Sequence, residues 1–148
     1  MSRAMTTLAT IGYESAAQDE VIDRLKRAGV EVLIDVRAVA ASRRAGFSKR
    51  VLAASLEAAG IDYVHLRELG TPKPGRDAAH HGRIAEMHAI YEAHLREPAA
   101  QLELAKAAEI AGQRKAALLC YEADVHRCHR EIVAERLREK LGCEVENL

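Results

Sequence analysis

The sequence predicts a single α/β domain over residues 1–148, with three layers and a mostly parallel open sheet. The chain has 148 residues, which suits one domain with a sizeable core. Short apolar runs rich in β-branched residues alternate along it with stretches in which apolar residues recur at the helical period. Such alternation is typical of a parallel sheet that is covered by helices on both faces.

The first half of the chain contains three predicted strands and two predicted helices. Thr7–Gly12 (TLATIG) is a short strand, and Val30–Arg37 (VEVLIDVR) is apolar enough for a strand that is buried on both faces. Ile61–Leu66 (IDYVHL) is the third strand. The stretches 18–29 and 49–60 each place apolar side chains on one helical face and end in glycine, a common helix stop.

The second half begins with a segment that predicts a loop. Gly70–Gly82 (GTPKPGRDAAHHG) holds two prolines and three glycines, and its length suggests a lid or a binding role. Helices are predicted over residues 83–97, where Pro98 ends the pattern, and over 99–111. The remaining predicted elements are a fourth strand at 115–122, a last helix at 127–142 and a fifth, edge strand at 143–148.

The predicted strand order is 3-2-1-4-5, which is Rossmann-like and uses right-handed crossovers. The chain would then reverse direction between strands 1 and 4, and ligands of open α/β sheets bind at such a point, beyond the carboxyl ends of the strands. Polar residues gather in the four segments that follow strands 1 to 4, namely 12–15 (GYES), 35–49 (DVRAVAASRRAGFSK), 65–73 (HLRELGTPK) and 117–131 (ALLCYEADVHRCHRE). We therefore expect the functional site at this edge.

Composition excludes some classes of protein and leaves others open. A formal net charge of zero weighs against a non-specific nucleic-acid binder, and few aromatic residues leave few platforms for unpaired bases. A specific nucleic-acid partner and the oligomeric state stay open. The chain lacks the roughly 18-residue apolar run that spans a bilayer and the apolar stretch of a signal peptide, so we expect a cytoplasmic protein with no membrane partner. Three cysteines, an odd number, argue against a disulfide framework.

The segment after the second strand is basic, with five basic residues against one acidic residue between positions 35 and 50. Arginine suits phosphate or carboxylate because its guanidinium can bind them in a bidentate manner. This predicts a small anionic ligand. Two plainer interpretations stay open: Arg43, Arg44 and Arg50 can form a solvated face, and Asp35 and Arg37 can form a buried structural pair.

Four motifs, TIGYES, LIDVRAVAASRRAGFSK, IDYVHLRELGTPK and LLCYEADVHRCHRE, occur in an order that resembles the domain-of-unknown-function 488 family. The resemblance covers about nine-tenths of the chain and implies an α/β domain of uncharacterised activity. Two features depart from the family pattern: Tyr13-Glu14 stands where a His-Ser pair is common, and AVAA lacks a usual proline. The family's usual residues correspond here to Gly12, Asp35, Arg37, Ser42, Arg43, Phe47, Leu69, Gly70, Cys120, Glu122, Cys128, His129 and Arg130.

Two interpretations of the stretch after the fourth strand involve its cysteines. Cys120, His126, Cys128 and His129 are residue types that bind zinc. However, their spacing is not a standard one, and Cys128 and His129 on one helix would point about 100° apart, so we expect no metal. A cysteine between a strand end and a helix N-terminus is also the layout of rhodaneses and cysteine phosphatases. However, Arg127 lies one residue too far from Cys120 for a C-x5-R loop, and nearby acids would repel phosphate. Both thiols can instead be buried packing groups.

The third interpretation, which we favour, assigns acid–base chemistry to Glu122 and His129. The alternative is that Glu122 has only a structural role, in a salt bridge to Arg37 or Arg130. We expect an enzyme without a cofactor that acts on a phosphate-bearing or nucleotide-like ligand. The alternatives are a rhodanese-like or phosphatase-like cysteine enzyme and a non-catalytic binding module for nucleotides or nucleic acid. The predicted catalytic residues are Glu122, His129 and Cys120, and the predicted ligand-binding residues are Gly12, Tyr13, Asp35, Arg37, Ser42, Arg43 and Arg130.

Overall fold

A computed structural model describes residues 7–148 of the chain. Residues 1–6 lie outside the described part. They belong to the N-terminal stretch from which we expected a cytoplasmic protein. Among the helices of the described residues, none has the length and apolar character that crossing a membrane requires.

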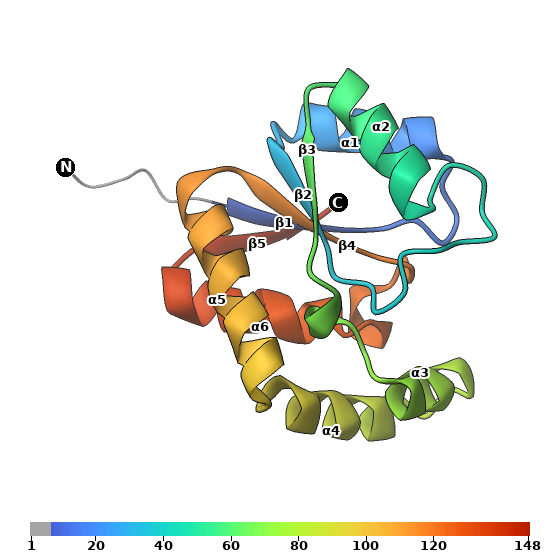
Figure 1. Cartoon of the computed structure of the whole chain (residues 1–148), viewed down its shortest axis with the longest axis vertical. Helices are drawn as coiled ribbons and strands as arrows, with labels where there is room; N and C mark the ends of the chain where they lie inside the picture. The colour runs from blue at the N-terminus through green and yellow to red at the C-terminus, as the bar shows by residue number, and fades with distance from the viewer. Residues whose placement is uncertain (1–6) are drawn as a thin grey trace.

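Five parallel strands form one sheet in the order β3-β2-β4-β1-β5 (Figure 1). The three inner strands are almost completely buried, whereas the two edge strands are partly exposed. This pattern confirms the predicted α/β class, the parallel sheet and the edge position of the last strand. The strands are β1 (Thr7–Gly12), β2 (Val32–Asp35), β3 (Asp62–His65), β4 (Ala116–Cys120) and β5 (Glu144–Asn147).

The predicted strand order 3-2-1-4-5 is wrong at its centre, because β4 lies between β2 and β1. Both β1 and β4 are apolar and buried, so their hydrophobic patterns do not say which of them occupies the central position. In the sheet, Ala117 of β4 lies opposite Leu33 on one side and Ala9 on the other. As a consequence, Cys120 at the end of β4 emerges between the ends of β2 and β1.

Helices cover both faces of the sheet (Figure 1). On one face, α1 (Gln18–Arg27) and α2 (Lys49–Ala58) bury leucines against the sheet. On the other face lie α4 (Ile84–Leu95), α5 (Pro98–Gln113) and α6 (Arg130–Leu141). The chain moves along the sheet in one direction from β1 to β3 and in the opposite direction from β3 to β5, which places right-handed crossovers on opposite faces.

A short helix, α3 (Lys73–His80), occupies most of the segment 70–82 that we predicted as a loop. Pro74 lies in its first turn, where a missing N–H breaks no intrahelical hydrogen bond and the fixed φ favours the helix. Pro98 likewise is the first residue of α5. The loop prediction was wrong because prolines at these positions begin helices.

The segment before α6 also differs from the prediction of one helix over 127–142. A short 3-10 turn, η2 (Val125–Arg127), comes first, Cys128 is extended with φ −125° and ψ 142°, and His129 is the N-cap of α6. Cys128 and His129 are therefore not consecutive residues of one helix. Our geometric argument against a shared metal ion was wrong on this point. A second 3-10 turn, η1 (Arg67–Leu69), follows β3.

Candidate functional site

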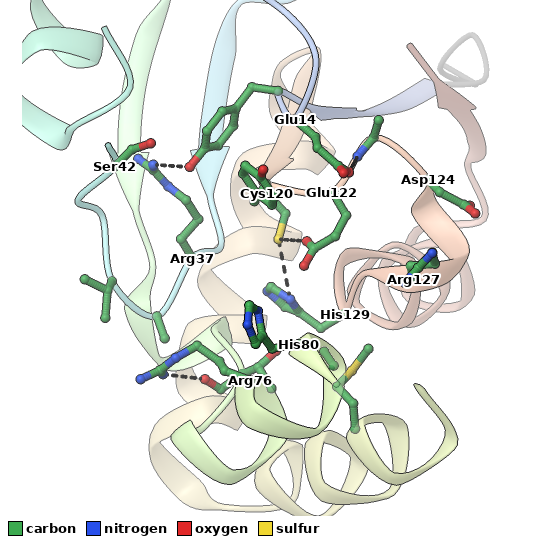
Figure 2. Close-up of a pocket in the computed structure, with 18 of the residues that line it drawn as sticks. Glu14, Arg37, Ser42, Arg76, His80, Cys120, Glu122, Asp124, Arg127 and His129 are labelled. Carbon is green, nitrogen blue, oxygen red and sulfur yellow. Dashed lines mark hydrogen bonds between the residues drawn. The ribbon is translucent and has the colours of Figure 1, made fainter. Parts of the chain in front are cut away.

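A cavity of about 770 Å³ opens at the carboxyl edge of the sheet (Figure 2). It is lined by the segments that follow β1, β2 and β4 and by residues of α3. The predicted site residues that line it are Tyr13, Arg37, Ser42, Arg43, Cys120, Glu122 and His129. The other three, Gly12, Asp35 and Arg130, lie behind the cavity wall and contact residues that line it.

Asp35 and Arg37 form a buried bidentate pair at the end of β2. Arg37 donates from Nε to Asp35 Oδ1 at 2.9 Å and from Nη2 to Oδ2 at 2.7 Å. Its Nη1 donates to the Tyr13 hydroxyl at 3.0 Å and to the Phe47 carbonyl at 2.8 Å. Burial lowers the pKa of Arg37, but Asp35 outweighs this effect and the net pKa is raised. The pair shapes the cavity wall, and the Arg37 charge is largely neutralised there.

Tyr13, the residue after β1, supports the same wall. Its ring stacks on Phe47, with centroids 4.2 Å apart and planes at 12° to each other. Both rings are buried, so the stacking fixes the Tyr13 hydroxyl beside Arg37. Tyr63 of β3 donates its hydroxyl to Asp35 at 2.5 Å and completes the set of contacts around that carboxylate.

Gly12 and Arg130 hold the backbone of the loop after β4. A Cβ atom on Gly12 would lie 1.7 Å from the Glu122 carbonyl oxygen, so only glycine lets this loop pass so close to β1. The Arg130 guanidinium is buried and donates to the carbonyl oxygens of Glu122 and Ala123. These contacts fix the direction in which the Glu122 side chain leaves the loop.

Cys120, Glu122 and His129 meet in the cavity wall (Figure 2). Cys120 Sγ lies 3.3 Å from Glu122 Oε2 and 3.6 Å from His129 Nδ1. His129 Nε2 lies 2.7 Å from the Val36 carbonyl oxygen. Because a carbonyl oxygen only accepts, Nε2 carries a proton, and when the ring holds only this proton, Nδ1 turns its lone pair toward the sulfur.

The surroundings of His129 have opposing effects on its protonation. Burial lowers the pKa of His129, whereas Cys128, the Val36 carbonyl and Glu122 raise it, and the net pKa is raised. The ring also lies against Tyr91, with ring centroids 5.1 Å apart. These contacts fix the orientation of the imidazole, so its Nδ1 atom stays directed toward the cavity wall.

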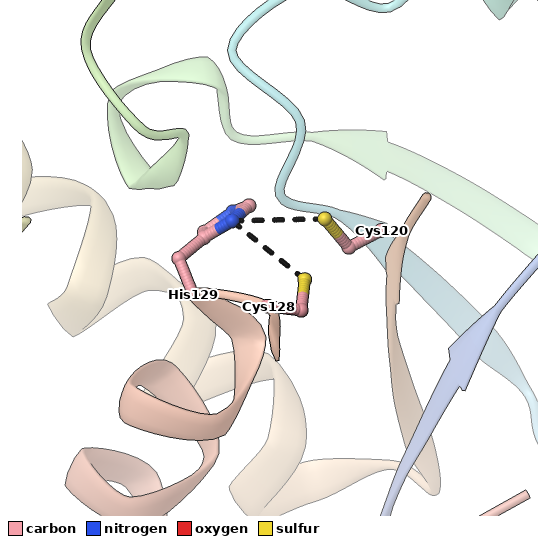
Figure 3. A group of neighbouring side chains, drawn as sticks. All are labelled: Cys120, Cys128 and His129. Atoms are coloured by element: carbon pink, nitrogen blue, oxygen red, sulfur yellow. Dashed lines mark hydrogen bonds between the residues drawn. The ribbon is translucent and has the colours of Figure 1, made fainter. Parts of the chain in front are cut away.

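Cys128 contacts His129 but does not line the cavity (Figure 3). Its Sγ lies 3.8 Å from His129 Nδ1, and burial raises the pKa of the Cys128 thiol well above its usual range. The ligand atoms of Cys120, Cys128 and His129 all lie within 4.8 Å of one another. Two sulfurs and one imidazole nitrogen are a donor set that can hold a metal ion.

Several cavity residues were missed by our interpretation of the sequence. Arg76 and His80 come from α3, and their spacing of four residues places them on one face of that helix. Recognising the helix would have revealed this pair. Arg127 is the last residue of η2, and Glu14, which follows β1, accepts a hydrogen bond from the Ala123 N–H at 3.1 Å. Both residues lie in segments that we expected at this edge, but the contact between Glu14 and Ala123 was not predicted, because it depends on β1 and β4 being neighbours.

The family model for Domain of unknown function DUF488 matches residues 17–137. Searches of curated proteins and of solved structures gave no match. The matched range extends from the residue before α1 to the middle of α6, and it includes Arg37, Cys120, Glu122 and His129. Gly12 and Tyr13 lie before it. Since the match covers well over half of the sequence and supports the resemblance of the motifs, the chain belongs to the DUF488 family of α/β domains.

Proposed function

We propose that this chain is an enzyme that binds a small phosphate-bearing or nucleotide-like ligand in the cavity and acts on it by acid–base chemistry. The observation that carries the proposal is the meeting of Cys120, Glu122 and His129 in the wall of the cavity. A carboxylate and an imidazole beside one reaction space are sufficient for general acid–base catalysis.

The charges around the cavity support an anionic ligand. Arg43, Arg76 and Arg127 line it and are exposed to solvent, and none of them forms an ion pair with any residue from 7 to 148. Guanidinium groups without an ion-pair partner suit phosphate or carboxylate oxygens, although Arg76 also donates to the Thr71 carbonyl at 2.9 Å. Arg37 contributes less than we expected, because Asp35 already neutralises it.

Apolar groups at the same cavity favour a ligand that also has a flat, apolar part. Val39 and Tyr121 line the cavity with exposed fractions of 56% and 43%. The Tyr121 and Tyr13 rings are nearly perpendicular, with centroids 5.4 Å apart, and the exposed Tyr121 ring can stack on a flat ligand. A nucleotide combines a stacking base with a phosphate and therefore fits both features.

Glu122 is the group that we assign to proton transfer. Its backbone is held by Gly12 and Arg130, and its carboxylate faces the cavity next to Cys120. In the free protein, the His129 Nδ1 lone pair can accept a proton from Cys120 and share this role.

A thiol enzyme is the second candidate, and the distance of 3.6 Å between Cys120 Sγ and His129 Nδ1 favours it. A cysteine beside a histidine that a third group orients is the arrangement of an activated nucleophile. Glu122 competes with this activation, because the Cys120 thiol donates its hydrogen to Glu122 Oε2 at 3.3 Å and not to His129. We therefore rank acid–base chemistry first.

The test combines ligand binding with turnover on a panel of nucleotides and other phosphate monoesters and diesters. We expect turnover of at least one compound, and we expect Glu122→Gln to lower kcat about 100-fold or more while the Kd changes little. Glu109→Gln, an exposed carboxylate on α5 outside the cavity, is the control. Binding without turnover across the panel would instead support the non-catalytic module.

A further inference from the structure

We propose that Cys120, Cys128 and His129 form a binding site for a divalent metal ion of the zinc type, whose fourth coordination position faces the cavity. The inference deepens the proposed function, since it concerns the same site. Only a catalytic role of the metal depends on the proposed function. Metal binding itself can be measured without a substrate.

Both nitrogen–sulfur distances in the cluster fit a tetrahedral ion, and the two sulfurs lie within 4.8 Å of each other. With Zn–S of about 2.3 Å and Zn–N of about 2.0–2.1 Å, a tetrahedral angle places nitrogen and sulfur about 3.6 Å apart. His129 Nδ1 lies 3.6 Å from Cys120 Sγ and 3.8 Å from Cys128 Sγ (Figure 3). The three side chains therefore need only small shifts to bind one ion.

Backbone geometry explains how neighbouring residues reach the same point. Cys128 is extended and His129 is the N-cap of α6, so their side chains leave the chain in directions that converge on the end of β4. Cys120 enters from that strand end. The site thus depends on the break between η2 and α6 and on the central position of β4.

The contact behind His129 is the kind that metal-binding histidines make. Its Nε2–H donates to the Val36 carbonyl at 2.7 Å, which fixes the tautomer and leaves Nδ1 free to coordinate. Ligating histidines usually donate their other ring N–H to a carbonyl or a carboxylate, and this contact increases the basicity of the ligand.

Charge balance also favours a divalent ion here. When the ion binds, Cys120 and Cys128 each release one proton and become thiolates, and the two negative charges offset the charge of the cation. A neutral centre suits a buried site, where an uncompensated charge costs a large free energy. Soft thiolate ligands with imidazole select zinc over magnesium or calcium.

The fourth position connects the metal to the proposed chemistry. Cys120 and His129 line the cavity, so an ion between them and Cys128 is reached from the cavity side. Glu122 Oε2 lies 3.3 Å from Cys120 Sγ, so its carboxylate lies beside the site and can take a proton from a water bound to the ion. A site with three protein ligands and one open position is the catalytic type. With the ion bound, Glu122 is the group left to move a proton.

The test measures metal content and Co²⁺ absorption on the full chain after it has been stripped with a chelator under reducing conditions. We expect about one Zn²⁺ or Co²⁺ ion per chain, and thiolate-to-Co²⁺ charge-transfer bands in the absorption spectrum. Cys120→Ser and Cys128→Ser should each lower the affinity at least about 100-fold. Cys143→Ser is the matched control, because Cys143 is also buried and free but lies outside this cluster.

Three results would overturn the site: a wild-type chain that binds no metal, binding that survives Cys128→Ser, and binding that is lost in Cys143→Ser. If Cys128→Ser does not fold, X-ray absorption on the zinc-loaded wild type decides, since it must find two sulfur neighbours and at least one nitrogen. If the chain binds no metal, the proposed acid–base activity is still possible. If the chain binds metal but turns over no substrate, the proposed activity is wrong and the metal site is still supported.

Discussion

A Cβ atom added to Gly12 would lie 1.7 Å from the carbonyl oxygen of Glu122 and 2.5 Å from its carbonyl carbon. These are backbone atoms, so they cannot move aside as the end of a flexible side chain can. Gly12 is paired with Cys120 across β1 and β4, and the loop after β4 therefore crosses directly over the end of β1. The position of Glu122 depends on this glycine.

Gly12→Ala should destabilise the chain by about 3 kcal/mol, at the upper end of the range for overpacking, because the β4 loop must shift. Urea unfolding measures the change. Gly112→Ala is the control: it lies in α5, its Cβ would be 3.4 Å from Leu141 Cδ2, and it should stabilise by up to about 1 kcal/mol. A Gly12→Ala chain as stable as wild type would show that the loop yields freely.

Local patterns predicted most of the strands and helices, because apolar periodicity depends on neighbours in the sequence. Strand order was not predictable in the same way, since β1 and β4 are equally apolar and only the complete set of contacts decides between them. The sequence argument against a shared metal ion failed for a related reason. Cys128 and His129 converge only because the helix begins at Arg130, and helix ends are the least certain feature of a sequence pattern.

Asp35 and Arg37 provide the second prediction, because both are buried and each satisfies the other. Arg37→Ala leaves a buried carboxylate without its cation and should cost about 3–5 kcal/mol in unfolding free energy. Arg43→Ala, which removes an exposed arginine, should change that free energy by less than about 0.5 kcal/mol.

A double substitution separates the lost ion pair from lost packing. Asp35→Asn combined with Arg37→Ala removes the unpaired charge, so the double variant should be more stable than Arg37→Ala alone. If the losses of unfolding free energy from Asp35→Asn and from Arg37→Ala simply add in the double variant, the Asp35–Arg37 pair is not the source of the stability loss.

Tyr63 provides a third prediction, on the alkaline side. Burial raises the pKa of Tyr63, and the Asp35 carboxylate adds to this shift. Because folding favours the protonated phenol, its contribution to stability is complete below the unfolded pKa of about 10 and is lost as pH rises above it. The difference in unfolding free energy between wild type and Tyr63→Phe should therefore be constant from neutral pH to about pH 9 and then change in favour of Tyr63→Phe. A difference independent of pH would contradict the cause given for the shift.

Anion binding is the fourth prediction. Phosphate should raise the melting temperature, because a ligand at 100 times its Kd adds about 2.7 kcal/mol to the folded state. Replacing both Arg43 and Arg76 with alanine should remove most of this rise. Arg50→Ala is the control, since Arg50 is an exposed arginine of the same basic segment that does not line the cavity. An equal response in the double variant would place the anion elsewhere.

The last prediction separates Glu122 chemistry from a thiol nucleophile by looking for a bond to Cys120. In a thiol mechanism, the sulfur attacks the ligand and holds part of it covalently until water releases it. Acid–base chemistry forms no such bond. Acid-quenched samples of the wild type and of Glu122→Gln, taken during incubation with a substrate found on the panel, should therefore show the unmodified protein mass.

Glu122→Gln is the more informative of the two samples. If Glu122 activates the water that releases a thiol intermediate, the amide variant would accumulate a Cys120 adduct, and the acid–base assignment would be wrong. Alkylation with iodoacetamide after unfolding shows that the method detects a modified thiol. The unmodified mass, together with a kcat lowered about 100-fold in Glu122→Gln, is the result that assigns the proton transfer to Glu122.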